Sequence, residues 1–159
     1  MSGSEEARRG MHQEETWVDL VSRLLQYESR RHTGGLDLPE ATTRLCHTMR
    51  PYLVDIMGAG GFRSMMLHAR MTMLMSRSMA EGRISLADLI NVDDEGVLTL
   101  LEKSRLDSTH KAVVVSILAH FLELLTDFIG HNLVLRMVHQ AWPDFEILQP
   151  FSTRKREQK

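Results

Sequence analysis

The chain has 159 residues, of which 43% are hydrophobic and 25% charged, with 19 Lys and Arg against 21 Asp and Glu. This size and composition are typical of one soluble domain, which at about 150 residues buries roughly 70% of its unfolded surface and needs no disulfide or structural metal. A formal net charge of −2 argues against a protein whose main task is to neutralise nucleic-acid phosphates.

Cys46 is the single cysteine, so no disulfide can form within the chain, and we expect it to be a small buried hydrophobe. The N-terminus lacks the basic start and apolar run of a secretory signal. The longest charge-free run of the last apolar segment, Ala112–Leu122, has 11 residues, short of the roughly 20 that cross a bilayer. We therefore expect a cytoplasmic protein without membrane insertion, with a flexible tail over residues 1–14, a helical domain over 15–148 and a flexible basic tail over 149–159.

The first part of the domain predicts two helices. Apolar residues at helical spacing, from Trp17 to Leu25, indicate an amphipathic helix over 16–31. A second helix begins near Pro39, a favoured first-turn residue. Because Pro51 removes a helical hydrogen bond inside this second helix, we expect a kink or a restart there.

Gly58–Gly61 is the clearest helix breaker, and it separates the second helix from a third that runs from Phe62 to about Ala80. The third helix holds six of the eleven methionines, and its apolar residues extend most of the way around it. Such a helix is buried on several sides or lies at an oligomer interface.

The rest of the domain predicts a hairpin and one long helix. Val92–Val97 has a turn centre between short apolar runs, so we expect a small β-hairpin near residues 89–100. From Ser108 or Thr109 the chain enters its longest helical pattern, which extends to Trp142 and is stopped by Pro143.

Arg63, Arg70 and Arg77 are spaced by seven residues and share one face of the third helix. One interpretation is a solvated edge on an otherwise apolar helix. The alternative is an anion or nucleotide site, because a glycine turn that leads into a helix N-terminus presents free backbone N–H groups. The residues of that site would be Gly60, Gly61, Arg63, Arg70 and Arg136.

The last helix carries four side chains that can ligate metals, within about 80° of one another on one face: His120, Glu123, Asp127 and His131. Metal-binding bundles use such inward-facing ligands together with a matching set on a second helix, and no Glu-x-x-His occurs elsewhere in this sequence. A solvent-exposed polar face is the simpler interpretation, and a metal site is the alternative.

Past Gly130 the apolar pattern shifts. In a straight helix Asn132, Arg136 and His139 lie on the arc that is apolar before Gly130. Either Gly130 permits a kink, which leaves Arg136 exposed, or the helix end is buried all round and Arg136 is paired with a carboxylate or a bound anion.

Two groups of residues carry a resemblance. Gly58–Arg63 opens one helix, and Phe128–Gly130, Leu133–Arg136 and Ala141–Pro143 close another. In these motifs, over about residues 50–144, the chain resembles a set of small bacterial all-helical proteins to which no activity is assigned. The resemblance implies an all-helical fold and a bacterial origin, and it implies no mechanism.

Together these patterns predict an all-α fold, a single compact bundle of four to five helices with a short β-hairpin near 89–100. Because no catalytic set has a recognisable local signature, we expect a non-enzymatic interaction or regulatory module, without a cofactor, that associates with itself through the Met-rich helix. The alternatives are an anion- or nucleotide-binding sensor or enzyme at the glycine turn, and a metal-binding helical protein. A DNA-binding role ranks lower because we find no helix-turn-helix signature.

Overall fold

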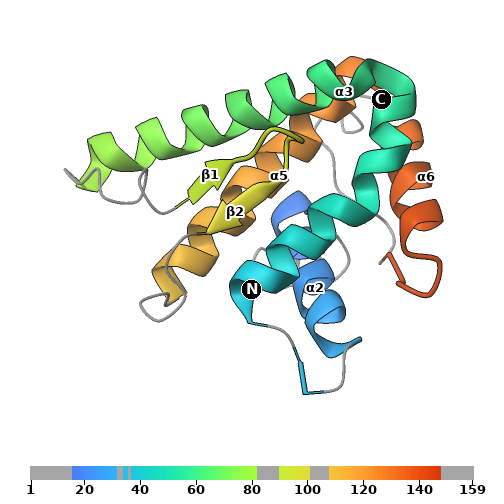
Figure 1. Cartoon of the computed structure of the whole chain (residues 1–159), viewed down its shortest axis with the longest axis horizontal. Coiled ribbons are helices and arrows are strands. Elements are labelled where there is room, and N and C mark those ends of the chain that lie inside the picture. Colours follow the sequence, from blue (N-terminus) through green and yellow to red (C-terminus); the bar gives the residue numbers. More distant parts are fainter. Residues whose placement is uncertain (1–15, 32–33, 36, 82–89, 101–107, 148–159) are drawn as a thin grey trace, which may run out of the picture.

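The computed structural model describes residues 16–31, 34–35, 37–81, 90–100 and 108–147, with the backbone alone for 77–81 and 108. Its elements in chain order are α2 (Trp17–Arg30), α3 (Leu38–Glu81), β1 (Ile90–Val92), β2 (Leu98–Leu100), α5 (Ser108–Ile129) and α6 (His131–Ala141). Figure 1 shows a helical bundle with one two-stranded hairpin, which confirms the predicted all-α class. The predicted tails over 1–14 and 149–159 lie outside the described residues.

Helix α2 begins at Trp17 because Thr16 caps it. The Thr16 hydroxyl accepts a hydrogen bond from the Asp19 N–H at 3.2 Å, and the Asp19 carboxylate accepts one from the Thr16 N–H at 3.3 Å, which forms a reciprocal capping box. The side of α2 that faces the core carries Trp17, Leu20, Val21, Leu24, Leu25 and Glu28. The predicted helix over 16–31 is thereby confirmed.

Helix α3 passes through Pro51 without interruption, so the predicted restart there is wrong. Pro51 and His47 are both exposed, so water can satisfy the His47 carbonyl that loses its helical partner. The break comes at Gly58, whose φ of 81° and ψ of 161° lie in a region open essentially to glycine alone. Gly58 divides α3 into a near half (38–57) and a far half (59–81), which meet at a sharp corner in Figure 1.

Strands β1 and β2 pair antiparallel in the predicted place, with partners Ile90–Leu100, Asn91–Thr99 and Val92–Leu98.

The side chain of Asp93 organises the hairpin turn. Its Oδ1 accepts hydrogen bonds from the N–H groups of Glu95 at 2.8 Å and Val97 at 2.9 Å. Gly96 has a φ of 86°, and a Cβ there would lie 2.7 Å from the Phe62 ring. Both the backbone angle and the close approach of α3 therefore require glycine at this turn.

A second glycine break separates α5 from α6, so the predicted single helix from 108 to 142 is in fact two. Gly130 has a φ of 97° and a ψ of 153°, close to the angles of Gly58. The break turns the apolar side of α6 inward and buries Val134, Met137 and Val138. Arg136 is exposed, which confirms the kinked alternative.

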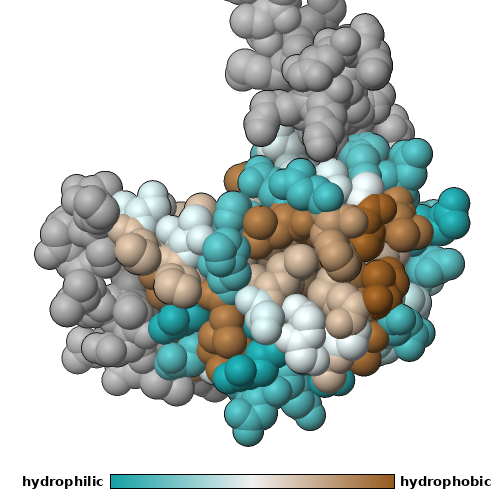
Figure 2. Space-filling model, turned by 90° about the horizontal axis from the view of Figure 1, so that it is seen from above, coloured by the Kyte–Doolittle hydropathy of each residue, from teal (hydrophilic) through white to brown (hydrophobic). Residues whose placement is uncertain are grey.

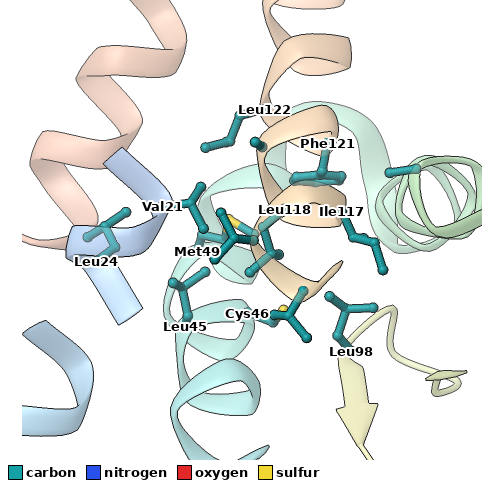
Figure 3. Packing of buried hydrophobic residues seen from close by; sticks show 14 of the residues in the cluster. Val21, Leu24, Leu45, Cys46, Met49, Leu98, Ile117, Leu118, Phe121 and Leu122 are labelled. Carbon is teal, nitrogen blue, oxygen red and sulfur yellow. The ribbon is translucent and has the colours of Figure 1, made fainter. Parts of the chain in front are cut away.

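Helix α5 lies at the centre of the core. Figure 3 shows four side chains of α5, Ile117, Leu118, Phe121 and Leu122, packed among residues of α2, α3 and β2: Val21, Leu24, Leu45, Cys46, Met49 and Leu98. Phe62 on the far half of α3 adds an edge-to-face contact with Phe121, with ring centroids 5.6 Å apart. Among the described residues, α5 is also the helix long and apolar enough to cross a membrane, a criterion that the core helix of a soluble protein meets as well.

Candidate functional site

A groove of about 500 Å³ opens between the near half of α3 and strand β2. It is bounded on one side by the first three turns of α3 and on the other by the end of the hairpin. The Thr43 hydroxyl spans the two walls, because it donates a hydrogen bond to the Leu98 carbonyl at 3.4 Å. The described residues that line the groove are Pro39, Glu40, Thr43, Arg44, His47, Thr99 and Leu100.

Three ionisable side chains face this groove. Glu40, Arg44 and His47 are all exposed. Within the part of the chain that the structure describes, the side chains of Arg44 and His47 form no hydrogen bond and no ion pair. The groove therefore offers two polar, cation-forming groups that are not used to hold the fold together. Sequence analysis missed it because the wall formed by β2 is distant in sequence.

Most of the exposed large apolar side chains among the described residues fall in two stretches of the fold, and Val18 on α2 and Tyr52 on the near half of α3 are further ones. Met71 and Met75, which are 52% and 58% exposed, lie on the far half of α3, and Ile56, Phe128 and Leu133 lie close in sequence to the two glycine breaks. Viewed from above in Figure 2, brown and tan surface covers a larger area on the right, where α3 turns, and a smaller one on the left, toward the far end of α3.

The predicted arginine stripe holds the hairpin against α3. Arg63 Nε donates to the Asp93 carbonyl at 3.0 Å, and Arg70 Nε donates to the Ile90 carbonyl at 2.6 Å. Arg50, on the near half of α3, bonds the hairpin turn in the same way at 2.9 Å. Arg63 and Arg70 are half-buried, so this part of the stripe is a clamp rather than a solvated edge. The side chain of Arg77 lies outside the described residues.

The glycines proposed for an anion site do not form the turn itself. Gly58 alone has non-helical angles, and Gly60 and Gly61 are already part of the helix. Arg63 donates its Nε to the hairpin, and Arg136 is exposed on α6. An anion site at this corner stays a prediction that no contact in the structure supports.

The four side chains predicted as metal ligands are not gathered into one cluster. His120 Nδ1 lies 3.4 Å from Glu123 Oε1, and Asp127 is exposed. His131 follows the break at Gly130, and its ring meets the edge of Trp17 with centroids 6.4 Å apart. Among the residues described, no three His, Cys, Asp or Glu side chains are placed to hold a metal ion. For His131 the physical reason is the helix break, because the predicted face assumed a straight helix. His120, Glu123 and Asp127 all lie on α5, and a shared helix face alone does not bring their side chains together.

Glu28 is a fully buried carboxylate that sequence analysis missed. Its Oε2 accepts a hydrogen bond from the Trp142 indole N–H at 2.6 Å and lies 3.4 Å from the Thr48 hydroxyl and 3.7 Å from the Arg31 guanidinium. Its Oε1 is buried and has no hydrogen-bond partner among the described residues. Glu28 thus ties α2 to α3 and to the residue that follows α6. A signal was present, because Glu28 continues the apolar stripe of α2 at the next helical position after Leu24.

Cys46 is buried, as expected from the sequence. Burial raises the pKa of its thiol to about 12, although a hydrogen bond with the Leu98 backbone acts in the opposite direction. The thiol therefore stays protonated at neutral pH and is not a nucleophile.

Comparison of the chain with models of protein families, with curated proteins and with solved structures finds no match. Function therefore has to be argued from the surfaces and side chains of this molecule.

Proposed function

We propose that the chain is a non-enzymatic helical module that binds a second copy of itself through the outer face of the far half of α3. The observation that carries this proposal is the exposure of Met71 and Met75, at 52% and 58%. They are one helical turn apart, so their side chains lie on the same face. Flexible thioether side chains adapt readily to a partner surface.

The exposed methionines belong to a longer row. Ser64, His68, Met71 and Met75 are all exposed on α3, and their spacing of four, three and four residues is the one that keeps a helix face turned toward a partner helix. We call these four residues the α3 stripe. It contains no carboxylate or guanidinium group, so apposition of two copies would bury no obligatory charge.

The α3 stripe is complementary to itself. A twofold axis that relates two antiparallel copies of α3 places His68 opposite Met71 of the other copy, and it also places Ser64 opposite Met75, because both pairs share one centre along the helix. The small serine then leaves room for the long methionine. A closed twofold contact of this kind gives a dimer rather than an open filament.

The structural use of buried and half-buried polar side chains also supports a binding role. Glu28, Arg63 and Arg70 are engaged in hydrogen bonds that join one element to another. These contacts give the three side chains a structural role, so their presence in the chain does not require a catalytic one.

Sedimentation velocity over a range of protein concentrations tests the proposal. Wild-type protein is expected to form dimers, and Met71→Glu with Met75→Glu is expected to be monomeric with an unchanged circular dichroism spectrum. Val18→Glu is the matched control, because Val18 is 49% exposed on α2 and lies off the stripe. Phe128→Glu tests the second apolar area. A monomeric wild type would overturn the proposal, as would dimers that only Phe128→Glu dissociates.

A further inference from the structure

We propose that the groove between α3 and β2 binds a small organic anion. The Arg44 guanidinium and His47 imidazole would hold its carboxylate or phosphate group, and its short apolar body would lie on Pro39 and Leu100. This site is separate from the α3 stripe, and the inference does not depend on self-association. It assigns a ligand to two polar side chains at the groove that no other described residue engages.

The position of the two groups on the helix favours an anion. Arg44 and His47 are three residues apart on α3 and line the same groove, so their side chains project from one face. A planar guanidinium binds a carboxylate or a phosphate through two parallel hydrogen bonds. Neither side chain is engaged by another described residue, so a ligand does not have to displace an internal contact.

The rest of the lining favours a small ligand with an apolar part. A volume of about 500 Å³ is within the range of roughly 300–1,000 Å³ that small-molecule sites show. Leu100 is 8% exposed and Pro39 is half-buried, so they give the groove an apolar floor. The Thr99 hydroxyl already donates a long hydrogen bond, 3.5 Å, to the Asn91 carbonyl and keeps acceptor capacity for a ligand donor.

Glu40 gives the groove a direction. Its carboxylate is exposed in the first turn of α3, one helical turn before Arg44, where it repels a second negative group on the ligand. The site therefore favours a ligand with one anionic end, placed toward Arg44 and His47.

Titrations with four probes followed by amide NMR shifts test this proposal on the full chain. Hexanoate and hexyl phosphate carry the two anionic groups on one apolar body, 1-hexanol lacks the charge, and inorganic phosphate lacks the body. We expect hexanoate or hexyl phosphate to shift the signals of Arg44, His47 and Leu100, and to bind at least about tenfold more tightly than either 1-hexanol or inorganic phosphate. The tighter of the two anions identifies the group that the site selects.

Three variants assign the binding to the groove. Arg44→Gln is expected to weaken binding about fivefold, as for an exposed charge pair, and Arg30→Gln, at an exposed arginine on α2, leaves it unchanged. Glu40→Gln is expected to strengthen binding about twofold because it removes a repulsion. Since all three side chains are exposed, folding should be preserved. Binding of 1-hexanol as tight as that of the anions, no binding of either anion, or equal losses in Arg44→Gln and Arg30→Gln would each overturn the proposal.

Discussion

Replacement of Trp142 by phenylalanine separates two contributions of this side chain to stability. The indole N–H lies 2.6 Å from Glu28 Oε2 and is the main donor to the buried carboxylate, because the Thr48 hydroxyl makes its shorter hydrogen bond, 2.9 Å, to the Arg44 carbonyl. Loss of the donor to this buried acceptor costs about 2–3 kcal/mol. The smaller ring leaves a packing defect of roughly 1 kcal/mol. We therefore expect Trp142→Phe to lower the free energy of unfolding by about 3–4 kcal/mol.

Glu28→Leu provides the control for this experiment. In that background the indole N–H has already lost its acceptor, so Trp142→Phe removes packing together with an unpaired buried donor and should cost at most about 1 kcal/mol. Urea denaturation followed by far-ultraviolet circular dichroism measures all four proteins of the cycle, and we expect a coupling energy of about 2–3 kcal/mol between the two sites. Equal costs of Trp142→Phe in both backgrounds would refute the reasoning, because the indole N–H would then contribute nothing through Glu28.

Three further changes test the backbone breaks, the hairpin turn and the buried thiol. Gly58→Ala and Gly130→Ala should each lower the free energy of unfolding by about 1–3 kcal/mol through backbone strain, although a Cβ meets no atom within 4 Å at either position. Gly60→Ala, at an open helical position, should raise the free energy of unfolding by up to about 1 kcal/mol. If urea denaturation shows that all three glycine variants change stability in the same direction, the effect does not come from the backbone angles. Gly96→Ala should lower the free energy of unfolding more than Gly58→Ala, because its Cβ would also lie 2.7 Å from the Phe62 ring and 3.0 Å from the Arg63 Cα. An equal or smaller decrease would show that the hairpin turn can move away from α3 without cost. Burial raises the pKa of the Cys46 thiol from 9.0 to about 12, so the folded chain holds this proton more tightly than the unfolded chain. The stability that the protonated thiol contributes is therefore fully present below pH 9 and is lost as the pH rises toward 12. The stability of wild type relative to Cys46→Ala should fall over that pH range, and a constant difference would count against burial of the thiol.

Local signals predicted the elements that depend on neighbouring residues. Apolar spacing from Trp17 onward located α2, which the Thr16–Asp19 cap starts, and the turn centre within 92–97 located the hairpin, whose turn Asp93 and Gly96 form. Gly130 was identified as the place where the apolar face shifts, and it is where the helix breaks. In each case the decisive hydrogen bond or backbone angle lies within a few residues of the signal, so no knowledge of the tertiary fold is needed.

The same signals were misleading where solvent exposure decides the outcome. Pro51 lacks an N–H donor, yet the helix continues because the carbonyl that it leaves unpaired belongs to an exposed residue, His47. A straight last helix placed His120 and His131 on one face, and the break at Gly130 separates them. Exposure and kinks depend on packing that a single sequence does not reveal.

The candidate site and the buried carboxylate depend on contacts between distant residues. Glu28 and Trp142 are separated by 114 positions, and Thr43 bonds Leu98 across 55 positions. The roles of Arg63 and Arg70 also depend on contacts between distant residues, because their partners are carbonyls of the hairpin. No periodicity in the sequence identifies such pairs, although the place of Glu28 on the apolar stripe of α2 marked it as a residue that requires a partner.

Disulfide cross-linking tests the central claim, twofold pairing of α3, most directly. In a Cys46→Ala background, a mixture of the single variants His68→Cys and Met71→Cys should form a covalent heterodimer under mild oxidation, because the proposed pairing places the two thiols opposite each other. One cysteine per chain excludes the intrachain bridge that two cysteines three residues apart on one helix can form. Val18→Cys, equally accessible on α2, should give little cross-linked product. A covalent heterodimer from the mixture, with the control remaining monomeric, is the result that the account predicts. Equal cross-linking of the mixture and the control, or none in either, would contradict it.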